Sequence, residues 1–209
     1  MTRNEALFTA VSKGKRNDVQ AIVNQLLGAG TSAEEILMGT MIPAMRDIGD
    51  RFSRNEVYVP EMLIAARAMQ AGLTIIEPIL TKAGHKPLGK VCVGTVKGDL
   101  HDIGKNLVAM MLKGAGFEVL DLGVDCDIGK FEQGVAQGAN VILCSALLTT
   151  TMPYMKQIVD AFKNRPAIHV IIGGAPVTQQ YAQEIGAHGY GSDANDAVRA
   201  VEKVLGIKA

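Results

Sequence analysis

Apolar side chains recur at helical spacing in the first 83 residues. Leu7 and Val11 form one short stripe, and a second stripe over residues 19–27 stops at the glycines of Gly28-Ala29-Gly30. The following Thr31-Ser32-Ala33-Glu34 has the form of a capping box, in which a hydroxyl and a carboxylate satisfy free backbone donors at a helix start. A third helix is therefore expected to begin there.

Two prolines divide the rest of this half. Pro43 interrupts the third helical stretch, and we expect it to kink or restart the helix because it lacks a backbone N–H. Pro60 suits the first turn of a fourth helix. The apolar face of that helix consists of Met62, Leu63, Ala66, Met69, Leu73 and Ile76. Four helices of this length predict a small helical bundle over residues 1–83.

The second half, over residues 90–209, alternates short apolar runs with helical patterns. A polar linker containing Gly and Pro precedes it at residues 84–89. Alternating strands and helices predict parallel strands joined by right-handed crossovers, here a flavodoxin-like, Rossmann-like α/β domain with a five-stranded parallel sheet. The predicted strands cover residues 91–96, 118–122, 141–147, 168–172 and 189–191, and the last helix covers residues 194–205.

Composition narrows the function classes. The 209 residues are 48% hydrophobic, carry a net charge of zero and contain no Trp. Neither charge nor aromatic content therefore suggests nucleic acid or an anionic membrane as a partner. The N-terminus lacks an apolar leader, and no apolar run reaches ~18 residues. The cysteines Cys92, Cys126 and Cys144 lack metal-ligand spacing and are expected to be buried thiols in a reducing cytoplasm.

The candidate chemistry lies in the hexapeptide from Asp99 to Gly104, Asp-Leu-His-Asp-Ile-Gly. It follows the strand predicted over residues 91–96 and precedes a predicted helix, so His101 lies on a loop at the carboxyl edge of the sheet, where open α/β sheets bind ligands. Asp99 can accept a hydrogen bond from one ring nitrogen of His101 and make the other a better ligand. Gly104 leaves room for a large planar ligand to approach the backbone.

Two later strand ends should lie at the same edge of the sheet. The third predicted strand runs into Ser145-Ala146-Leu147-Leu148-Thr149-Thr150-Thr151, and the fourth runs into Gly173-Gly174. Small and hydroxyl side chains at this edge would shape a narrow slot between strands. Taken singly, each segment is ordinary turn chemistry, and it is their combination with the hexapeptide that points to a ligand.

The pattern Asp99-x-His101-x-x-Gly104, with these two strand ends, resembles the cobalamin-binding module of methionine synthase and, more closely, the stand-alone corrinoid proteins of methyltransferase systems. The resemblance implies that His101 is the ligand of cobalt on the lower corrin face, with the cofactor base-off and His-on. It implies that Asp99 is the hydrogen-bonded partner of His101, and that Thr151 stands in place of a serine that continues the relay.

The same resemblance assigns further cofactor-binding residues. Within the hexapeptide these are Leu100, Asp102, Ile103 and Gly104. Along the slot for the displaced nucleotide tail they are Ser145, Leu147, Thr149, Gly173 and Gly174. Tyr190, Gly191 and Ser192 are placed where the last strand meets the nucleotide loop. For Asp102, a role as cap of the following helix is the alternative to cofactor contact.

The N-terminal half carries a second part of the resemblance. Gly49-Asp50-Arg51-Phe52 followed by Val59-Pro60-Glu61-Met62 is similar to the helical cap of the same family. The match implies that Phe52 and Val59 cover the methyl face of the corrin. An apolar residue at helical spacing is otherwise core, so plain bundle core is the alternative for Phe52.

The resemblance implies a non-catalytic carrier subunit. Such a protein accepts a methyl group on Co(I) from a substrate:corrinoid methyltransferase and passes it from methyl-Co(III) to a second methyltransferase, with tetrahydrofolate or a thiol as acceptor. A reductive activase is a further expected partner. The alternative is a cobalamin-dependent sensor or regulator, which the neutral charge and the cap-like region around Phe52 disfavour. The small subunit of an adenosylcobalamin mutase shares the histidine loop but not this cap.

Overall fold

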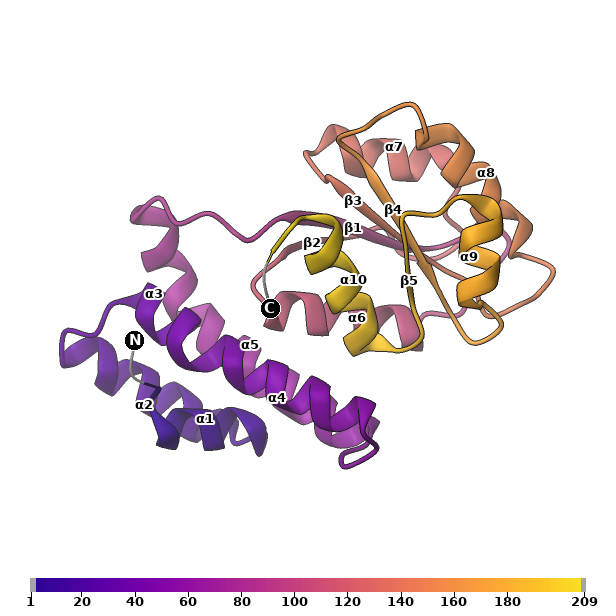
Figure 1. Ribbon diagram of the computed structural model, residues 1–209. Helices are drawn as coiled ribbons and strands as arrows, with labels where there is room; N and C mark the ends of the chain where they lie inside the picture. The colour runs from indigo at the N-terminus through magenta and orange to yellow at the C-terminus, as the bar shows by residue number, and fades with distance from the viewer. Residues whose placement is uncertain (1–2, 208–209) are drawn as a thin grey trace. The chain divides into compact units, whose positions relative to one another are not determined.

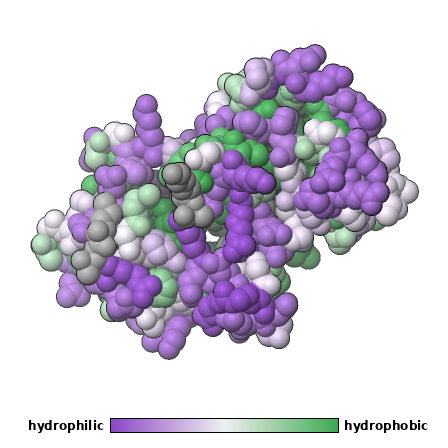
Figure 2. Space-filling view, in the orientation of Figure 1, coloured by the Kyte–Doolittle hydropathy of each residue, from purple (hydrophilic) through white to green (hydrophobic). Residues whose placement is uncertain are grey.

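The computed structural model describes residues 3–207 and divides into two compact units. The first extends to Pro87 and includes Lys113–Gly116; the second comprises Leu88–Leu112 and the chain from Phe117 onward. Pro87 lies inside the linker predicted over residues 84–89. Polar side chains dominate the face seen in Figure 2, and the apolar ones are mostly collected in the interior.

The first unit is helical, as the periodicity predicts (Figure 1). Ser32 begins the third helix, because its Oγ accepts a hydrogen bond from the backbone N of Glu35 at 3.1 Å. The cap therefore lies one residue later than the box predicted from Thr31 to Glu34. The elements are α1 Glu5–Ser12, α2 Arg16–Gly28, α3 Ala33–Ile36, η1 Leu37–Met41, α4 Ile42–Ser53 and α5 Val59–Lys82.

Pro43 restarts the third helix, as predicted. It lies in the first turn of α4, directly after the π-helical segment η1. A proline removes one backbone donor from the hydrogen-bond ladder, and a single π-turn can lie inside an otherwise continuous helix. The segments α3, η1 and α4 therefore follow one another without a loop, which keeps the total at four helical stretches.

Small residues let α5 pack closely against α2. Ala65, Ala68 and Gly72 are buried on α5, and a Cβ added at Gly72 would lie 2.6 Å from Cε of Met41 and 3.0 Å from Cγ1 of Val19. By length and composition alone, this 24-residue helix is apolar enough to cross a membrane. In this structure 44% of its most apolar window is buried inside the protein.

The second unit is a doubly wound α/β domain with the strand order β2-β1-β3-β4-β5, all parallel, which confirms the predicted fold class. Side chains of α7, α8 and α9 pack into one core with the sheet, while α10 contacts β4 and β5. The strands are β1 Lys90–Thr95, β2 Glu118–Asp121, β3 Val141–Ser145, β4 His169–Gly173 and β5 Gly189–Gly191. The helices are α6 Ile103–Gly114, α7 Ile128–Ala136, α8 Pro153–Phe162, α9 Gln179–Ile185 and α10 Ala194–Val204.

The strand order creates a switch point between β1 and β3. From β1 the chain crosses to β2 on one side of the sheet, whereas from β3 it crosses to β4 on the other, so the loops after β1 and β3 diverge. Strand β3 ends at Ser145 rather than at the predicted Leu147, because the backbone turns there toward the loop after β1. This edge of the sheet contains the hexapeptide identified from the sequence.

Candidate functional site

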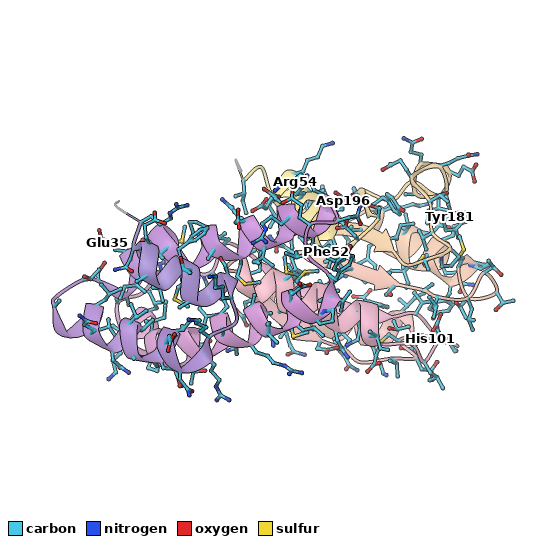
Figure 3. All side chains as sticks on the ribbon, turned by 90° about the horizontal axis from the view of Figure 1, so that it is seen from below. Glu35, Phe52, Arg54, His101, Tyr181 and Asp196 are labelled. Carbon is cyan, nitrogen blue, oxygen red and sulfur yellow. The ribbon has the colours of Figure 1, made fainter. Side chains whose placement is uncertain are left out.

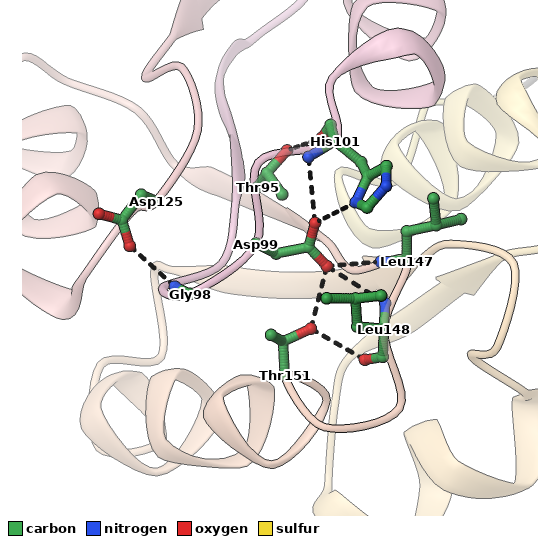
Figure 4. A network of polar contacts seen from close by, with 8 residues as sticks. All are labelled: Thr95, Gly98, Asp99, His101, Asp125, Leu147, Leu148 and Thr151. Atoms are coloured by element: carbon green, nitrogen blue, oxygen red, sulfur yellow. Dashed lines mark hydrogen bonds and ion pairs between the residues drawn. The ribbon is translucent and has the colours of Figure 1, made fainter.

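Asp99 organises the loop between β1 and α6. Its side chain is fully buried, and Oδ1 lies 2.8 Å from Nδ1 of His101 and accepts the backbone N–H of the same residue at 3.1 Å. Oδ2 accepts the backbone N–H groups of Leu147 at 2.8 Å and Leu148 at 3.2 Å, and lies 3.0 Å from Oγ1 of Thr151. Figure 4 shows these contacts converging on one carboxylate. Two loops 48 residues apart are thereby joined.

The carboxylate of Asp99 is held ionised. Burial by itself would raise the pKa of this group, but the hydrogen bonds from the backbone of Leu147 and His101, and from the side chains of His101 and Thr151, outweigh burial. The net effect is a pKa well below the usual range for an aspartate. At neutral pH the group is therefore an acceptor only.

An acceptor-only Asp99 sets the tautomer of His101. Nδ1 must carry the proton that points to Oδ1, so Nε2 of the neutral ring keeps its lone pair. Nε2 has no hydrogen-bond partner within residues 3–207, and the side chain is 52% exposed. Oγ1 of buried Thr95 also donates to the carbonyl of His101 at 2.7 Å. The lone pair of Nε2 is therefore used by no other group in the described residues, on the loop before α6 where Figure 3 labels His101.

Four large aliphatic side chains on the two loops that Asp99 joins are exposed to solvent. Leu100 is 72% exposed and Ile103 is 80% exposed, and both flank His101 in sequence. Leu147 and Leu148, whose backbones bind Asp99, are 44% and 41% exposed. Exposed aliphatic side chains on loops that also present a polar group are typical of a ligand surface.

Gly104 lies in the first turn of α6 with open space beside it. An added Cβ would meet no heavy atom within 4 Å, and the backbone of this residue does not require glycine. A glycine in a helix costs about 1 kcal/mol relative to alanine. The chain's own packing gives no reason for that cost, whereas a flat ligand approaching the backbone does.

Small residues occupy the last paired row of the sheet. Thr95 of β1 pairs with Ser145 of β3, Ser145 with Gly173 of β4, and Gly173 with Gly191 of β5. A Cβ on Gly173 would lie 2.7 Å from the carbonyl oxygen of Gly191. Gly174, with φ +127°, would bring a Cβ to 1.9 Å from the carbonyl oxygen of Ala146. The close approach of the strand ends therefore itself requires both predicted glycines.

Other predicted site residues already have partners in the protein. Tyr190 donates its hydroxyl to the carbonyl of Val177 at 3.0 Å, and the Ser192 hydroxyl donates to the carboxylate of Asp196. Thr149 is exposed at the loop after β3. All three lie at the carboxyl edge of the sheet, and their contact with a nucleotide tail stays a prediction.

The carboxylate of Asp102 faces the following helix. Its Oδ2 accepts from Nδ2 of Asn106 at 3.0 Å, and its carbonyl oxygen accepts the backbone N–H of Asn106 at 2.7 Å. The Asp102 side chain therefore contacts the first turn of α6 through Asn106, and its contact with a cofactor stays a prediction.

In the first unit, Phe52 is half-buried near the end of α4, and Val59 is 36% exposed at the start of α5. Between them lie an ion pair of Arg54 with Glu56, 2.6 Å apart, and a 64% exposed Tyr58. The turn thus presents apolar side chains to solvent. A role of Phe52 and Val59 over a ligand stays a prediction.

Sequence reasoning missed three contributors to this site. The local pattern marks Thr95 only as part of a strand and Leu148 only as part of a turn, and it does not single out Asp125. Asp125 lies in the loop after β2, where its Oδ1 accepts the backbone N–H of Gly98 at 2.8 Å. Gly98-Asp99 directly after a strand is the local signal of a tight turn, but nothing local identifies its partner in another loop.

The described residues contain no group of three or more His, Cys, Asp or Glu side chains that could hold a metal ion. Cys92, Cys126 and Cys144 are buried, as predicted. Burial raises the pKa of Cys92 to about 12 and that of Cys144 well above its usual value. The role of the His101 imidazole as a metal ligand stays a prediction.

Comparison with known proteins agrees with this site. Residues 89–199 match a B12 binding domain, and residues 3–77 match a second family that is also described as a B12 binding domain. The chain is 40% identical to the trimethylamine corrinoid protein of Methanosarcina barkeri, with 90% of this chain and 89% of that protein covered.

Two solved structures are similar over nearly the whole chain. A cobalamin-binding protein from Desulfitobacterium hafniense DCB-2 is 29% identical with a TM-score of 0.79, covering 95% of this chain and 97% of that one. A chain of the methanol:cobalamin methyltransferase complex from Methanosarcina barkeri is 26% identical with a TM-score of 0.85, covering 98% and 80%. On the sequence matches and the shared two-unit fold, this chain belongs to the family of B12-binding corrinoid proteins.

Proposed function

We propose that this protein is a methyl carrier that binds a corrinoid and serves two methyltransferases in turn. One partner transfers a methyl group from a small substrate, and the other delivers it to tetrahydrofolate or a thiol. The observation that carries the proposal is the half-exposed His101 imidazole, whose Nδ1 is held by ionised Asp99, on a loop that also exposes Leu100 and Ile103. Relatives named as methylamine corrinoid proteins, at 37% to 40% identity, support a carrier over a sensor or regulator.

The residues around His101 fit a corrinoid. Nε2 would bind cobalt on the lower face, in a base-off, His-on mode. Leu100, Ile103 and Leu147 would cover the apolar ring edge, and the open space at Gly104 would admit it. The displaced nucleotide tail would enter at the row of Thr95, Ser145, Gly173 and Gly191, where side chains are small. When bound, the corrinoid supplies a cobalt centre that takes up and gives up a methyl group.

The protein's own part is to orient and tune the imidazole. Asp99 keeps the proton on Nδ1, and its negative charge makes the lone pair of Nε2 a stronger electron-pair donor to a metal. Leu147 and Leu148 hold Asp99 in place through rigid backbone donors. Thr151 adds a hydroxyl that lies 2.8 Å from the carbonyl of Leu148 as well as 3.0 Å from Asp99. Its single proton serves one of these acceptors at a time, so this contact is the adjustable one.

The first unit completes the proposed carrier. Phe52 and Val59 would shield the reactive face from water and oxidants between transfers. A reductive activase would restore protein inactivated by oxidation, and we place the system in the cytoplasm. The similar chain from Methanosarcina barkeri is part of a methanol:cobalamin methyltransferase complex, which supports a methyltransferase as the first partner.

The test is reconstitution with hydroxocobalamin, followed by desalting and visible spectroscopy of wild type and His101→Ala. A matched control is His188→Ala, because His188 lies directly before β5, at the opposite edge of the sheet. We expect about one equivalent of corrinoid in wild type and control, and a weakened or altered spectrum in His101→Ala. A colourless wild type would refute corrinoid binding, and an unchanged His101→Ala would refute the axial role. Uptake of radiolabelled methyl from methyl iodide by the reduced protein then tests the carrier step.

A further inference from the structure

Asp125 contacts the loop of the hexapeptide on both sides of Asp99. Its backbone N–H donates to the carbonyl oxygen of Asp99 at 3.0 Å, and its Oδ1 accepts the backbone N–H of Gly98 at 2.8 Å. Figure 4 shows Asp125 across Gly98 from His101. The peptide group after Asp99 and the peptide group before Gly98 are therefore held by one residue of a different loop.

The two loops run side by side up to this point. The backbone N–H of Thr95 donates to Gly123 at 3.0 Å, that of Cys126 donates to Thr95 at 2.9 Å, and Val96 forms a parallel bridge with Cys126. These contacts continue the pairing of β1 with β2 beyond both strands. Asp125 is where that pairing reaches Asp99.

The backbone of Asp125 has an uncommon conformation that suits these contacts. Its φ is +50°, in the left-handed region that residues other than glycine adopt uncommonly and that Asp and Asn tolerate best. The residue is exposed, so core packing does not impose the conformation. The conformation does aim both the N–H and the carboxylate at the hexapeptide loop. Strain that is held in this way beside a ligand residue often marks a functional constraint.

We propose that Asp125 is a positioning residue for His101 and acts through the backbone of Asp99. The inference rests on the proposed function, in which Nε2 of His101 binds cobalt. Leu147 and Leu148 hold Oδ2 of Asp99, whereas the angle at which Oδ1 meets the imidazole depends on the Asp99 backbone, which Asp125 restrains at the Asp99 carbonyl and at the Gly98 N–H. When the contacts from Asp125 are lost, Nδ1 of His101 loses its aligned acceptor and the ring samples its other tautomer.

The variants separate the carboxylate from the backbone strain. Asp125→Gly removes the acceptor of the Gly98 N–H while tolerating positive φ, so the fold should persist. Asp125→Asn keeps an acceptor oxygen and tolerates the left-handed conformation. Asp125→Ala removes the acceptor but keeps a Cβ, as a second route to the same loss. The matched control is Asp127→Gly in the same loop, whose carboxylate caps α7 by accepting the backbone N–H of Lys130 at 3.0 Å.

The first measurement is the ¹⁵N spectrum of the His101 ring in the protein without corrinoid. Wild type, Asp125→Asn and Asp127→Gly should show one tautomer with Nδ1 protonated. Asp125→Gly and Asp125→Ala should show a second tautomer or faster exchange of the Nδ1 proton, in chains whose circular dichroism is that of wild type. A folded Asp125→Gly with the wild-type tautomer overturns the proposal, whatever the protein binds.

The second measurement uses the protein loaded with cob(II)alamin. Wild type should show hyperfine splitting from an axial nitrogen in electron paramagnetic resonance. In Asp125→Gly we expect broadening of that splitting and up to about tenfold weaker retention, below the 10–100-fold loss typical of a group that touches the metal ligand. If wild type labelled with ¹⁵N-histidine keeps the same splitting pattern as the unlabelled protein, the axial nitrogen is not a histidine nitrogen and the proposed axial ligand is wrong. The ¹⁵N result on the free protein still decides the role of Asp125, so the two failures are distinguishable.

Discussion

Replacing Asp99 by asparagine tests the central claim, because the change keeps the shape of the side chain and removes one acceptor and the charge. In wild type, Oδ1 accepts two N–H groups of His101, and Oδ2 accepts those of Leu147 and Leu148 with the hydroxyl of Thr151 beside it. An amide can place its NH₂ toward only one of these two sets of donors. Each placement leaves a different group unpaired.

The contacts indicate which of the two amide orientations has the lower free energy. With NH₂ toward the loop after β3, two backbone N–H groups lose their acceptor, at about 1–3 kcal/mol each. With NH₂ toward His101, only one backbone N–H loses its acceptor, because the ring can change tautomer and accept at Nδ1. We therefore expect Asp99→Asn to lower the free energy of unfolding by about 1–3 kcal/mol and to move the ring proton onto Nε2. That proton occupies the lone pair that would bind cobalt.

Two assays on the same preparation measure these effects. Urea unfolding gives the free energy difference, and ¹⁵N spectra of the His101 ring report which nitrogen is protonated. Hydroxocobalamin retention should fall toward that of His101→Ala. The reasoning is refuted if Asp99→Asn unfolds within about 0.5 kcal/mol of wild type, or if it keeps Nε2 unprotonated. Thr151→Val is a useful companion, because it should weaken the network without changing the tautomer.

Four further predictions follow from single contacts. The folded-state pKa of Asp99 is lowered, so the stability that its ionised form provides should be complete above about pH 5 and should fall as the pH drops below about 4. The difference in unfolding free energy between wild type and Asp99→Asn should therefore become smaller as the pH is lowered. In the absence of corrinoid, Gly104→Ala should leave the unfolding free energy unchanged or raise it by up to about 1 kcal/mol. It should weaken corrinoid binding measured by calorimetry, and equal binding would contradict the proposal that the corrin ring uses the open space at Gly104. In urea unfolding, Gly174→Ala should cost more than about 3 kcal/mol, because its Cβ would lie 1.9 Å from a carbonyl oxygen at φ +127°. The control Gly28→Ala, at the end of α2 with nothing within 4 Å, should be neutral or up to about 1 kcal/mol more stable. Nζ of buried Lys105 lies 2.5 Å from Oδ1 of the half-exposed Asp121. Lys105→Met should change the unfolding free energy by less than about 1 kcal/mol, because an apolar side chain replaces the buried charge. Asp121→Ala should cost about 2 kcal/mol or more, because it leaves the buried ammonium without this partner.

Local information accounts for most of the architecture. Helical and strand periodicity identified the four helical stretches and the five parallel strands, because each element must present its apolar side chains to a core. Errors fell at element ends, such as the cap at Ser32 and the end of β3 at Ser145. Those ends depend on hydrogen bonds to other segments, which periodicity does not contain.

The part of the site that is local was also accessible from sequence. Asp99 and His101 are two residues apart on one loop, so their hydrogen bond was predictable from spacing and the position after a strand. The open space beside Gly104 could also be anticipated from local sequence, because glycine has no side chain. Each of these relations lies within one turn of chain.

The tertiary structure decided what fixes the Asp99–His101 pair. Leu147, Leu148 and Thr151 reach Asp99 from 48 to 52 residues away, and Asp125 reaches Gly98 from 27 residues away. The row of small residues from Thr95 to Gly191 exists only through the register of four strands. Exposure of Leu100 and Ile103 likewise depends on what packs around the loop. The sequence by itself determined the chemical groups and their local order, whereas strand pairing and burial determined which distant donors converge on one carboxylate, because such contacts follow from the packed sheet and not from neighbouring residues.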